Sequence, residues 1–359
     1  MMEKGSPNQA AAGLPDDLIV EILARLPAGP LCRCKCVSQS WRALISDPAH
    51  RARFAHTLSG FFVFSRPHSA SAPSSWSFIA IQQSPPLVDT ALSFLPPSHG
   101  EIDILDSRNG LLLLRCPGEG DRHPCYVVCN PATAEWVALP QPSQTPGQQC
   151  DRDGRGLKTT SAALGFNPAV SSCFYVFQLM EEKWVYNNVN VIRAVEIYSS
   201  ETGAWISRLS GWKDRLVFFA GNKTYFKVQD RAYITCVFVG HSQGRLRYVH
   251  EDDEQPGDSL SICVLEGNVN EEFTVKHSVR KMDLFGPRKS RWPKEHQTVA
   301  FHPDGNLIFL YHRPSDRLMC YDMNRREMHV ICDVGGVKPC QHLFLPYVPY
   351  YSRVLVSPN

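Results

Sequence analysis

Two stretches organise the N-terminal part of this chain: LPDDLIVEILARLP at residues 14–27 and CVSQSWRALISDP at residues 36–48. In the first, Pro15 suits the start of a helix, and the carboxylates of Asp16 and Asp17 complement the positive end of the helix dipole. A spacing of four residues then places several apolar side chains on one stripe. These are Leu18, Ile22 and Leu26, together with Ile19 and Leu23. The stretch predicts an amphipathic helix that begins near residue 15.

The helical pattern continues in shorter pieces. Pro27, Gly29 and Pro30 predict the end of the first helix. The second stretch predicts another helix, with Val37, Trp41, Leu44 and Ile45 on one face. Asp47-Pro48 is typical of a helix start, and predicts a third helix that runs toward Phe54.

This helical module carries more apolar side chains than it can bury alone. It is only about 40 residues long, near the size at which a lone domain struggles to form a core. Some of its leucines and isoleucines must therefore be covered by something else. One candidate is a partner protein bound against the helices. The other is the rest of this chain.

The two stretches resemble the F-box motif, and most of all the F-boxes of the large plant subfamily. The resemblance rests on the first Leu-Pro pair, the second Leu-Pro pair and the Val-x-x-x-Trp spacing of Val37 and Trp41. It implies docking on a Skp-type adaptor that is joined to a cullin scaffold. Gln39 stands where a lysine is common in the family, which should tune the affinity for the adaptor. The resemblance implies adaptor contacts at Leu14, Pro15, Leu18, Ile22, Leu26, Pro27, Leu31, Val37 and Trp41.

From Phe61 onward the apolar residues recur with a period of two, which predicts a β domain. Clusters of Gly, Pro, Asn, Asp and Ser separate the runs, as in a series of hairpins. The predicted strands cover residues 61–64, 78–81, 110–114, 126–129, 173–179, 191–198, 233–239, 262–265, 307–311 and 354–356.

A weak internal repeat suggests how these strands are arranged. VCNPATAEW at 128–136 resembles IYSSETGAW at 197–205, and YDMNRREM at 321–328 is a looser copy. Each copy has the pattern strand, polar turn, strand, which is typical of β-propeller blades, and the domain has room for about six. A large two-sheet β-sandwich is the alternative. We assign Trp136 and Trp205, which are equivalent in the repeat, to blade packing; exposed binding anchors are the alternative.

The predicted architecture is thus α+β by module, with a three-helix F-box at residues 10–56 and a β-propeller-like domain at residues 60–357. The second domain also resembles the F-box-associated domains of plant proteins, where propeller-like folds occur. Segments 65–77 and 140–158 are rich in polar residues, Pro and Gly, and are interpreted as exposed loops. Loops at one rim are the expected recognition surface, whereas the acidic run 251–254 is interpreted as a solvated turn.

One motif suggests catalysis. Residues 240–244, GHSQG, fit the nucleophile-elbow pattern, in which Ser242 would need a strand-to-helix turn, an oxyanion hole and acid and histidine partners. The following residues, 245–250, alternate like a second strand, so we predict a hairpin instead. The histidines lack metal-ligand spacing, and no phosphate-binding loop pattern occurs. Cys32, Cys34 and Cys36 alternate, but on a helix Cys34 points away from the other two. We expect no catalytic residue, metal or cofactor.

Composition excludes several of the remaining classes of function. The formal net charge is +2, so there is no global electrostatic case for nucleic-acid or acidic-membrane binding. No run of apolar residues is long enough for a membrane helix, and no signal-peptide pattern begins the chain. The 13 cysteines are expected to be reduced, and the protein to reside in the cytoplasm or nucleus.

The resemblance therefore implies the substrate-recognition subunit of a Skp-cullin-F-box (SCF) E3 ubiquitin ligase, with an unknown protein substrate on the β domain. The alternatives are a serine hydrolase that uses Ser242, or an F-box scaffold that acts without a cullin.

Overall fold

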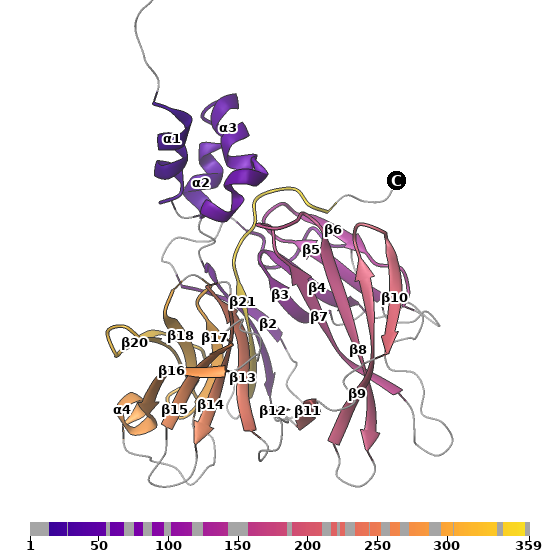
Figure 1. The fold of residues 1–359 in the computed structure, drawn as a ribbon, viewed down its shortest axis with the longest axis vertical. Coiled ribbons are helices and arrows are strands. Elements are labelled where there is room, and N and C mark those ends of the chain that lie inside the picture. Colours follow the sequence, from indigo (N-terminus) through magenta and orange to yellow (C-terminus); the bar gives the residue numbers. More distant parts are fainter. Residues whose placement is uncertain are drawn as a thin grey trace, which may run out of the picture. The chain divides into compact units, whose positions relative to one another are not determined.

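The computed structural model divides the chain into two compact units, residues 1–55 and 56–359 (Figure 1). It describes residues 14–26, 28–54, 58–67, 75–81, 88–96, 102–116, 125–142, 157–184, 189–209, 217–220, 223–226, 234–243, 245–252, 259–265, 273–286, 296–303, 305–335 and 340–355. None of the helices in these ranges is long and apolar enough to cross a membrane.

The first unit is helical, as predicted, but its elements are shorter than the pattern suggested. It contains α1 (Asp16–Leu23), α2 (Ala28–Cys34), α3 (Gln39–Ser46) and the 3₁₀ helix η1 (Pro48–Arg53). Ser38 caps α3, because its Oγ accepts a hydrogen bond from the Trp41 N–H (3.1 Å). Asp47 caps η1 in the same way, through the Ala49 N–H (2.8 Å).

Two expectations for these helices are wrong. Gly29 and Pro30 lie inside the first turn of α2 instead of ending α1. The first-turn N–H groups have no partner within the helix, so proline is tolerated there. Val37 does not share a helix face with Trp41, because Val37 precedes the cap of α3 and lies in a turn.

The second unit is a five-bladed β-propeller, so the propeller alternative is confirmed and the sandwich is wrong. Two blades are separate four-stranded sheets: β3 (Asp103–Arg108), β4 (Leu111–Cys116), β5 (Cys125–Asn130) and β6 (Glu135–Ala138); and β17 (His296–Phe301), β18 (Leu307–His312), β19 (Arg317–Asp322) and β20 (Glu327–Asp333). A third, three-stranded blade has the order β2 (Ser75–Ala80), β1 (Gly60–Pro67), β21 (Cys340–Tyr347).

The other two blades belong to one continuous ten-stranded sheet. They are β7 (Leu157–Phe166), β8 (Phe174–Trp184), β9 (Val189–Ser199) and β10 (Ala204–Leu209); and β13 (Ile234–Ser242), β14 (Arg245–Asp252), β15 (Ser259–Leu265) and β16 (Phe273–Arg280), which α4 (Lys281–Phe285) follows. The short strands β11 (Val217–Ala220) and β12 (Lys223–Phe226) join them. This joining hairpin is one reason why fewer blades form than the expected six.

The ring closes through strands from both ends of the β unit. β1 pairs with β21 in antiparallel register from Gly60–Tyr347 to Pro67–Cys340. β21 is the innermost strand of its blade and lies beside β3 and β17, the innermost strands of the neighbouring blades. A blade assembled from the N- and C-terminal ends prevents the neighbouring blades from separating without breaking a strand ladder.

The three sequence copies are the outer hairpins of three blades, β5–β6, β9–β10 and β19–β20. Each turn begins with a residue whose side-chain oxygen accepts a hydrogen bond from the backbone N–H two residues later. These residues are Asn130 (3.0 Å), Ser199 (3.3 Å) and Asp322 (2.8 Å). Each turn ends on a residue with positive φ, at Ala134 (54°), Gly203 (67°) and Arg326 (59°). The repeat is therefore structural, although its sequence identity is low.

Four hydrophobic clusters hold neighbouring blades together. Trp205, half-buried, packs against the cluster between the β3–β6 and β7–β10 blades, and its Nε1–H donates to the Pro140 carbonyl (2.7 Å). Trp136 packs against the cluster that β1 and β21 share with β3–β5. Their assignment to blade packing is confirmed.

Some segments differ from prediction. Val354 and Leu355 form no strand, and Leu355 instead covers the cluster between β3–β6 and β7–β10 with irregular backbone; Val356 lies outside the described residues. The ends of the predicted loop 65–77 belong to β1 and β2, and residues 157–158 belong to β7. Glu251 and Asp252 end β14 instead of forming a turn. Residues 68–74, 143–156 and 253–254 lie outside the described ranges.

The turn between β3 and β4 generates the first prediction. Gly110 has a φ of +92°, and a Cβ added there would overlap the Cβ and backbone N of Tyr350, on the segment that follows β21. Gly110→Ala should therefore lower the free energy of unfolding by about 3 kcal/mol or more. The matched control is Gly203→Ala, which also has positive φ but meets nothing within 4 Å, and should cost about 1–2 kcal/mol. Chemical denaturation measures both; equal costs would contradict the packing of Tyr350 on this turn.

Candidate functional site

The first helix, α1, has two apolar faces instead of one stripe. Val20 and Leu23 are fully buried and point into the helical unit. Leu18 and Ile22 are one turn apart on the other side and about half exposed (49% and 50%). Leu14, two residues before the start of α1, is 56% exposed. A helix with apolar side chains on both sides is suited to burial between two bodies.

The inner face of α1 belongs to the core of the unit. Its buried members come from α1, α2, α3 and the residue that follows η1, so these segments are held as one body. They are Val20, Leu23, Leu31, Ile45 and Phe54, against which Ile19, Ala24, Leu26, Cys34, Trp41 and Leu44 pack.

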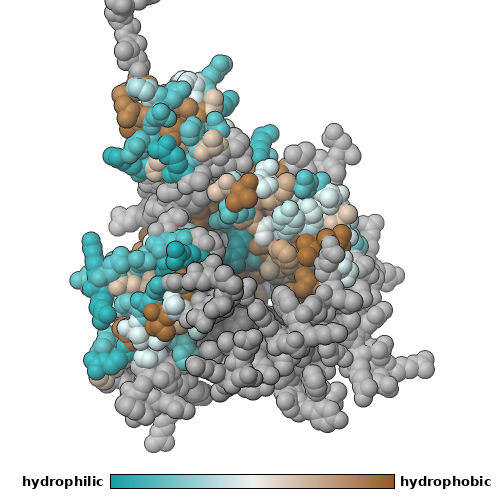
Figure 2. Space-filling view, viewed as in Figure 1, coloured by the Kyte–Doolittle hydropathy of each residue, from teal (hydrophilic) through white to brown (hydrophobic). Residues whose placement is uncertain are grey.

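A further exposed apolar side chain of the unit lies outside α1. Val37, in the turn before α3, is 63% exposed. We call Leu14, Leu18, Ile22 and Val37 the apolar stripe. Figure 2 shows brown apolar surface beside teal hydrophilic surface on the helical unit. Leaving large apolar side chains in water costs roughly 25 cal/mol per Å² relative to burial, so these residues form a candidate interaction surface.

The structure divides the nine implied adaptor residues into groups. Four form the apolar stripe, and Pro15 is exposed at the start of α1. Leu26 and Trp41 are half-buried and also serve the core, while Leu31 is buried (8% exposed) and serves it alone. Pro27 lies outside the described residues.

Charged residues border the stripe on α1. Asp16 and Asp17 are exposed in the first turn. Glu21 pairs with Arg25 (3.2 Å) on its own helix and with Arg53 of η1 (3.7 Å). These pairs are exposed, so each contributes little to stability. An apolar centre with a charged rim is the usual anatomy of a protein–protein interface.

Ser242 lies in a hairpin, as predicted. The strands β13 and β14 pair from Ser242–Arg245 inward, and only Gln243 (φ 51°) and Gly244 lie between them. A strand follows the motif where a nucleophile elbow needs a helix. The hydroxyl of Ser242 is fully buried and donates to the His302 carbonyl (2.6 Å). Its role is to join two neighbouring blades.

The alternating cysteines of the helical unit show no ligand set. Within the described ranges, no three His, Cys, Asp or Glu side chains are placed to hold a metal ion. Burial is the largest effect on Cys32 and raises the pKa of its thiol, which disfavours the thiolate that a metal needs.

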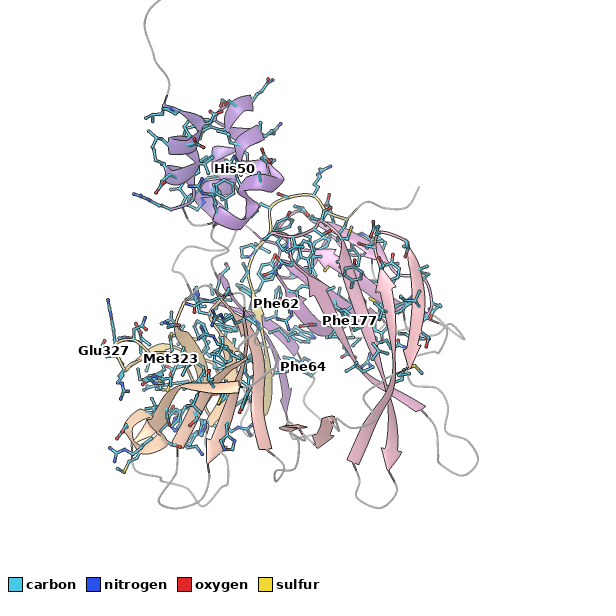
Figure 3. The ribbon with its side chains drawn as sticks, in the orientation of Figure 1. His50, Phe62, Phe64, Phe177, Met323 and Glu327 are labelled. Carbon is cyan, nitrogen blue, oxygen red and sulfur yellow. The ribbon has the colours of Figure 1, made fainter. Side chains whose placement is uncertain are left out.

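The structure shows a second apolar surface that was not predicted from the sequence. On the β7–β10 blade, Tyr175, Phe177, Leu179, Ile197 and Ile206 share the face opposite the buried Val176 and Tyr198. These five residues are exposed or half-buried, and none belongs to a hydrophobic cluster of the described residues. Figure 3 labels Phe177 on this blade and Phe62 and Phe64 on β1. Both faces of β8 and β9 carry apolar residues, so alternation alone could not tell which is covered.

Known proteins match both units. Residues 12–52 match the F-box domain, and residues 87–237 match the family "F-box protein At3g26010-like, beta-propeller". Among similar proteins of Arabidopsis thaliana, F-box protein At5g49610 is 33% identical over 194 residues (49% of this chain, 51% of the relative). F-box protein At3g26010 is 31% identical over 204 residues (54% and 42%).

The alignments thus span about half the length of these relatives. A solved structure of U3-55K aligns with a TM-score of 0.30 and 8% identity over 66% of this chain and 86% of that one. The resemblance to plant F-box proteins is confirmed by the matched families and relatives.

The buried hairpin position of Ser242 generates the second prediction. The purified protein should not react with a fluorophosphonate probe, because the hydroxyl is inaccessible and its proton is engaged by the His302 carbonyl. Mass spectrometry of the treated protein measures the labelling. Stoichiometric modification that disappears in Ser242→Ala would contradict this and support a hydrolase.

Proposed function

We propose that this chain, an F-box joined to a five-bladed propeller, is the substrate-recognition subunit of an SCF-type E3 ubiquitin ligase. The observation that carries the proposal is the apolar stripe of the F-box, which is exposed while the same helices bury a complete core on their other side. An F-box implies a Skp-type adaptor as partner. Through the adaptor, a cullin would join the complex.

The physical case for the adaptor is a difference between two faces of one helix. Burial of Leu18 and Ile22 against a partner would add favourable apolar contact without disturbing Val20 and Leu23. An amphipathic helix laid into an apolar groove is a common recognition mode. The stripe requires a partner with a groove of apolar side chains, which is the chemistry proposed for the adaptor.

The propeller is suited to the variable partner. The connections at one end of the blades are short: two residues, Asn109 and Gly110, separate β3 from β4, and two positions, 243 and 244, separate β13 from β14 in the sequence. The opposite strand ends flank longer connections, including 68–74, 117–124 and 143–156. We place substrate recognition at this second end, because long loops on a rigid scaffold accommodate different ligands.

In this proposal the chain itself is not catalytic. The adaptor, the cullin and the subunits they recruit would transfer ubiquitin, and the propeller would hold the substrate for them. The setting would be the cytoplasm or nucleus. Co-purification of a cullin with the tagged protein distinguishes this function from that of a cullin-independent F-box scaffold, which would retain the adaptor alone.

The third prediction tests the adaptor surface. Leu18→Asp combined with Ile22→Asp would place two charges in the apolar interface, and should weaken adaptor binding on the order of a hundredfold or more. Both side chains are half exposed, so the core should remain folded. Isothermal titration with a purified Skp-type adaptor measures the dissociation constant.

The matched control replaces two exposed apolar residues of the β unit, Val275 (62%) and Met282 (56%), with Asp. That variant should bind the adaptor as the unmodified protein does. Unchanged binding by a folded Leu18→Asp/Ile22→Asp protein would refute the proposed surface.

A further inference from the structure

Two cysteines face each other across the β4–β5 hairpin. Cys116 is the last residue of β4, Cys125 is the first residue of β5, and the strand register pairs them directly. Both are free and partly exposed. Their side chains lie on the face of the sheet that also carries Leu112, Leu114, Val127 and Cys129.

The hydrogen bonds of β5 define the distance between them. The Tyr126 carbonyl accepts from the Leu139 N–H (2.8 Å), so Tyr126 points its backbone groups toward β6. The backbone groups of the neighbouring residue, Cys125, therefore point toward β4. Cys116 and Cys125 then form a hydrogen-bonded pair, with Cα atoms about 5.5 Å apart. That separation lies within the range of protein disulfides.

The two thiols also interact. Burial, and then the charge and hydrogen bond of Cys125, raise the pKa of the Cys116 thiol to about 11. This contact brings the sulfur atoms within reach of one another while both remain reduced. The raised pKa makes the Cys116 thiolate scarce at neutral pH, so its oxidation should be faster in alkaline solution.

The propeller contains a second close pair that cannot be bridged. Cys320 on β19 and Cys332 on β20 occupy neighbouring strands, but Cys332 pairs with Leu318 and not with Cys320. Cys320 pairs with His329, and the register shifts between these two pairs, so the cysteines are no closer than diagonal neighbours, whose Cα atoms lie about 7–8 Å apart. This exceeds the separation at which a disulfide forms without backbone movement. The pair Cys320 and Cys332 therefore provides a control within the same molecule.

We propose that Cys116 and Cys125 form an intramolecular disulfide when the protein meets hydrogen peroxide. One thiolate attacks an oxygen of the peroxide and breaks the O–O bond, which gives a sulfenic acid and, after protonation, water. The second thiol attacks the sulfenic sulfur and expels its oxygen as a second water. The two sulfurs lose two electrons in all, which reduce the peroxide.

The cross-link would act at one end of a blade. It would fasten the ends of β4 and β5 beside the connection 117–124 and close a loop of residues 116–125. Loop closure of this size should raise the melting temperature by about 3–5 °C. The inference concerns the propeller alone and does not depend on adaptor binding.

The test uses full-length protein, reduced and then treated with a small excess of hydrogen peroxide at pH 7 and pH 9. Peptide mapping by mass spectrometry without reductant should identify a 116–125 cross-link, formed faster at pH 9 and reversed by dithiothreitol. Cys116→Ser and Cys125→Ser should each abolish that cross-link. Cys320→Ser should leave it unchanged, since Cys320 and Cys332 are too far apart.

Circular dichroism confirms that each variant is folded before oxidation. Persistence of free thiols at both positions under conditions that oxidise the exposed Cys36 would overturn the proposal. A predominant Cys320–Cys332 cross-link would overturn it as well, because the strand registers would then be wrong.

Discussion

The antiparallel ladder between β1 and β21 is the constraint on which the β unit depends. It joins residues near 60 to residues near 347, so every other blade lies on the chain between its two strands. Phe62 and Tyr347 pack edge to face (5.3 Å) against the β3–β6 side, while Phe61 packs on Phe309 (5.1 Å) of the opposite neighbour. One blade thus supports clusters on both sides. Chain closure over such a distance costs entropy, which the packing on both sides must offset.

The same strand β1 is also the first strand after the helical unit in the sequence. In the sequence, only residues 56–59 separate the helical unit from β1. In the proposed function, a substrate on the propeller would therefore be joined to the F-box through the strand that closes the ring. The two surfaces differ in kind, since the F-box presents fixed apolar side chains on a helix and the propeller presents connections that vary in length. A constant partner suits the first and a variable partner the second.

Much of the fold was predictable from the sequence, because local sequence signals agree with the tertiary structure. The turn residues Asn130, Ser199 and Asp322 revealed the repeated hairpin, and the alternation after Ser242 identified a strand where catalysis needed a helix. The division of α1 into a buried face and an exposed face was harder to predict from the sequence. Leu18 and Leu23 look alike in sequence, and only the placement of α2 and α3 decides that Leu23 is buried. Leu31 was expected at the adaptor contact from the family resemblance, and the structure places it in the core of the helical unit.

Other features depend on distant contacts that periodicity cannot report. Leu355 has the composition of a strand residue, yet it covers a cluster formed by β4–β9. The hairpin of β11 and β12 resembles blade strands but joins two blades. The pairing of Cys116 with Cys125 depends on the register between β4 and β5. The sequence does not define that register, because it does not show where the loop between the two strands begins and ends.

Hydrogen–deuterium exchange of the full-length protein, with and without a purified Skp-type adaptor, tests the central claim most directly. The account predicts that the adaptor slows exchange in α1 and in the turn that contains Val37, and leaves the strands of the propeller unchanged. Protection on the propeller with none on α1 would contradict it.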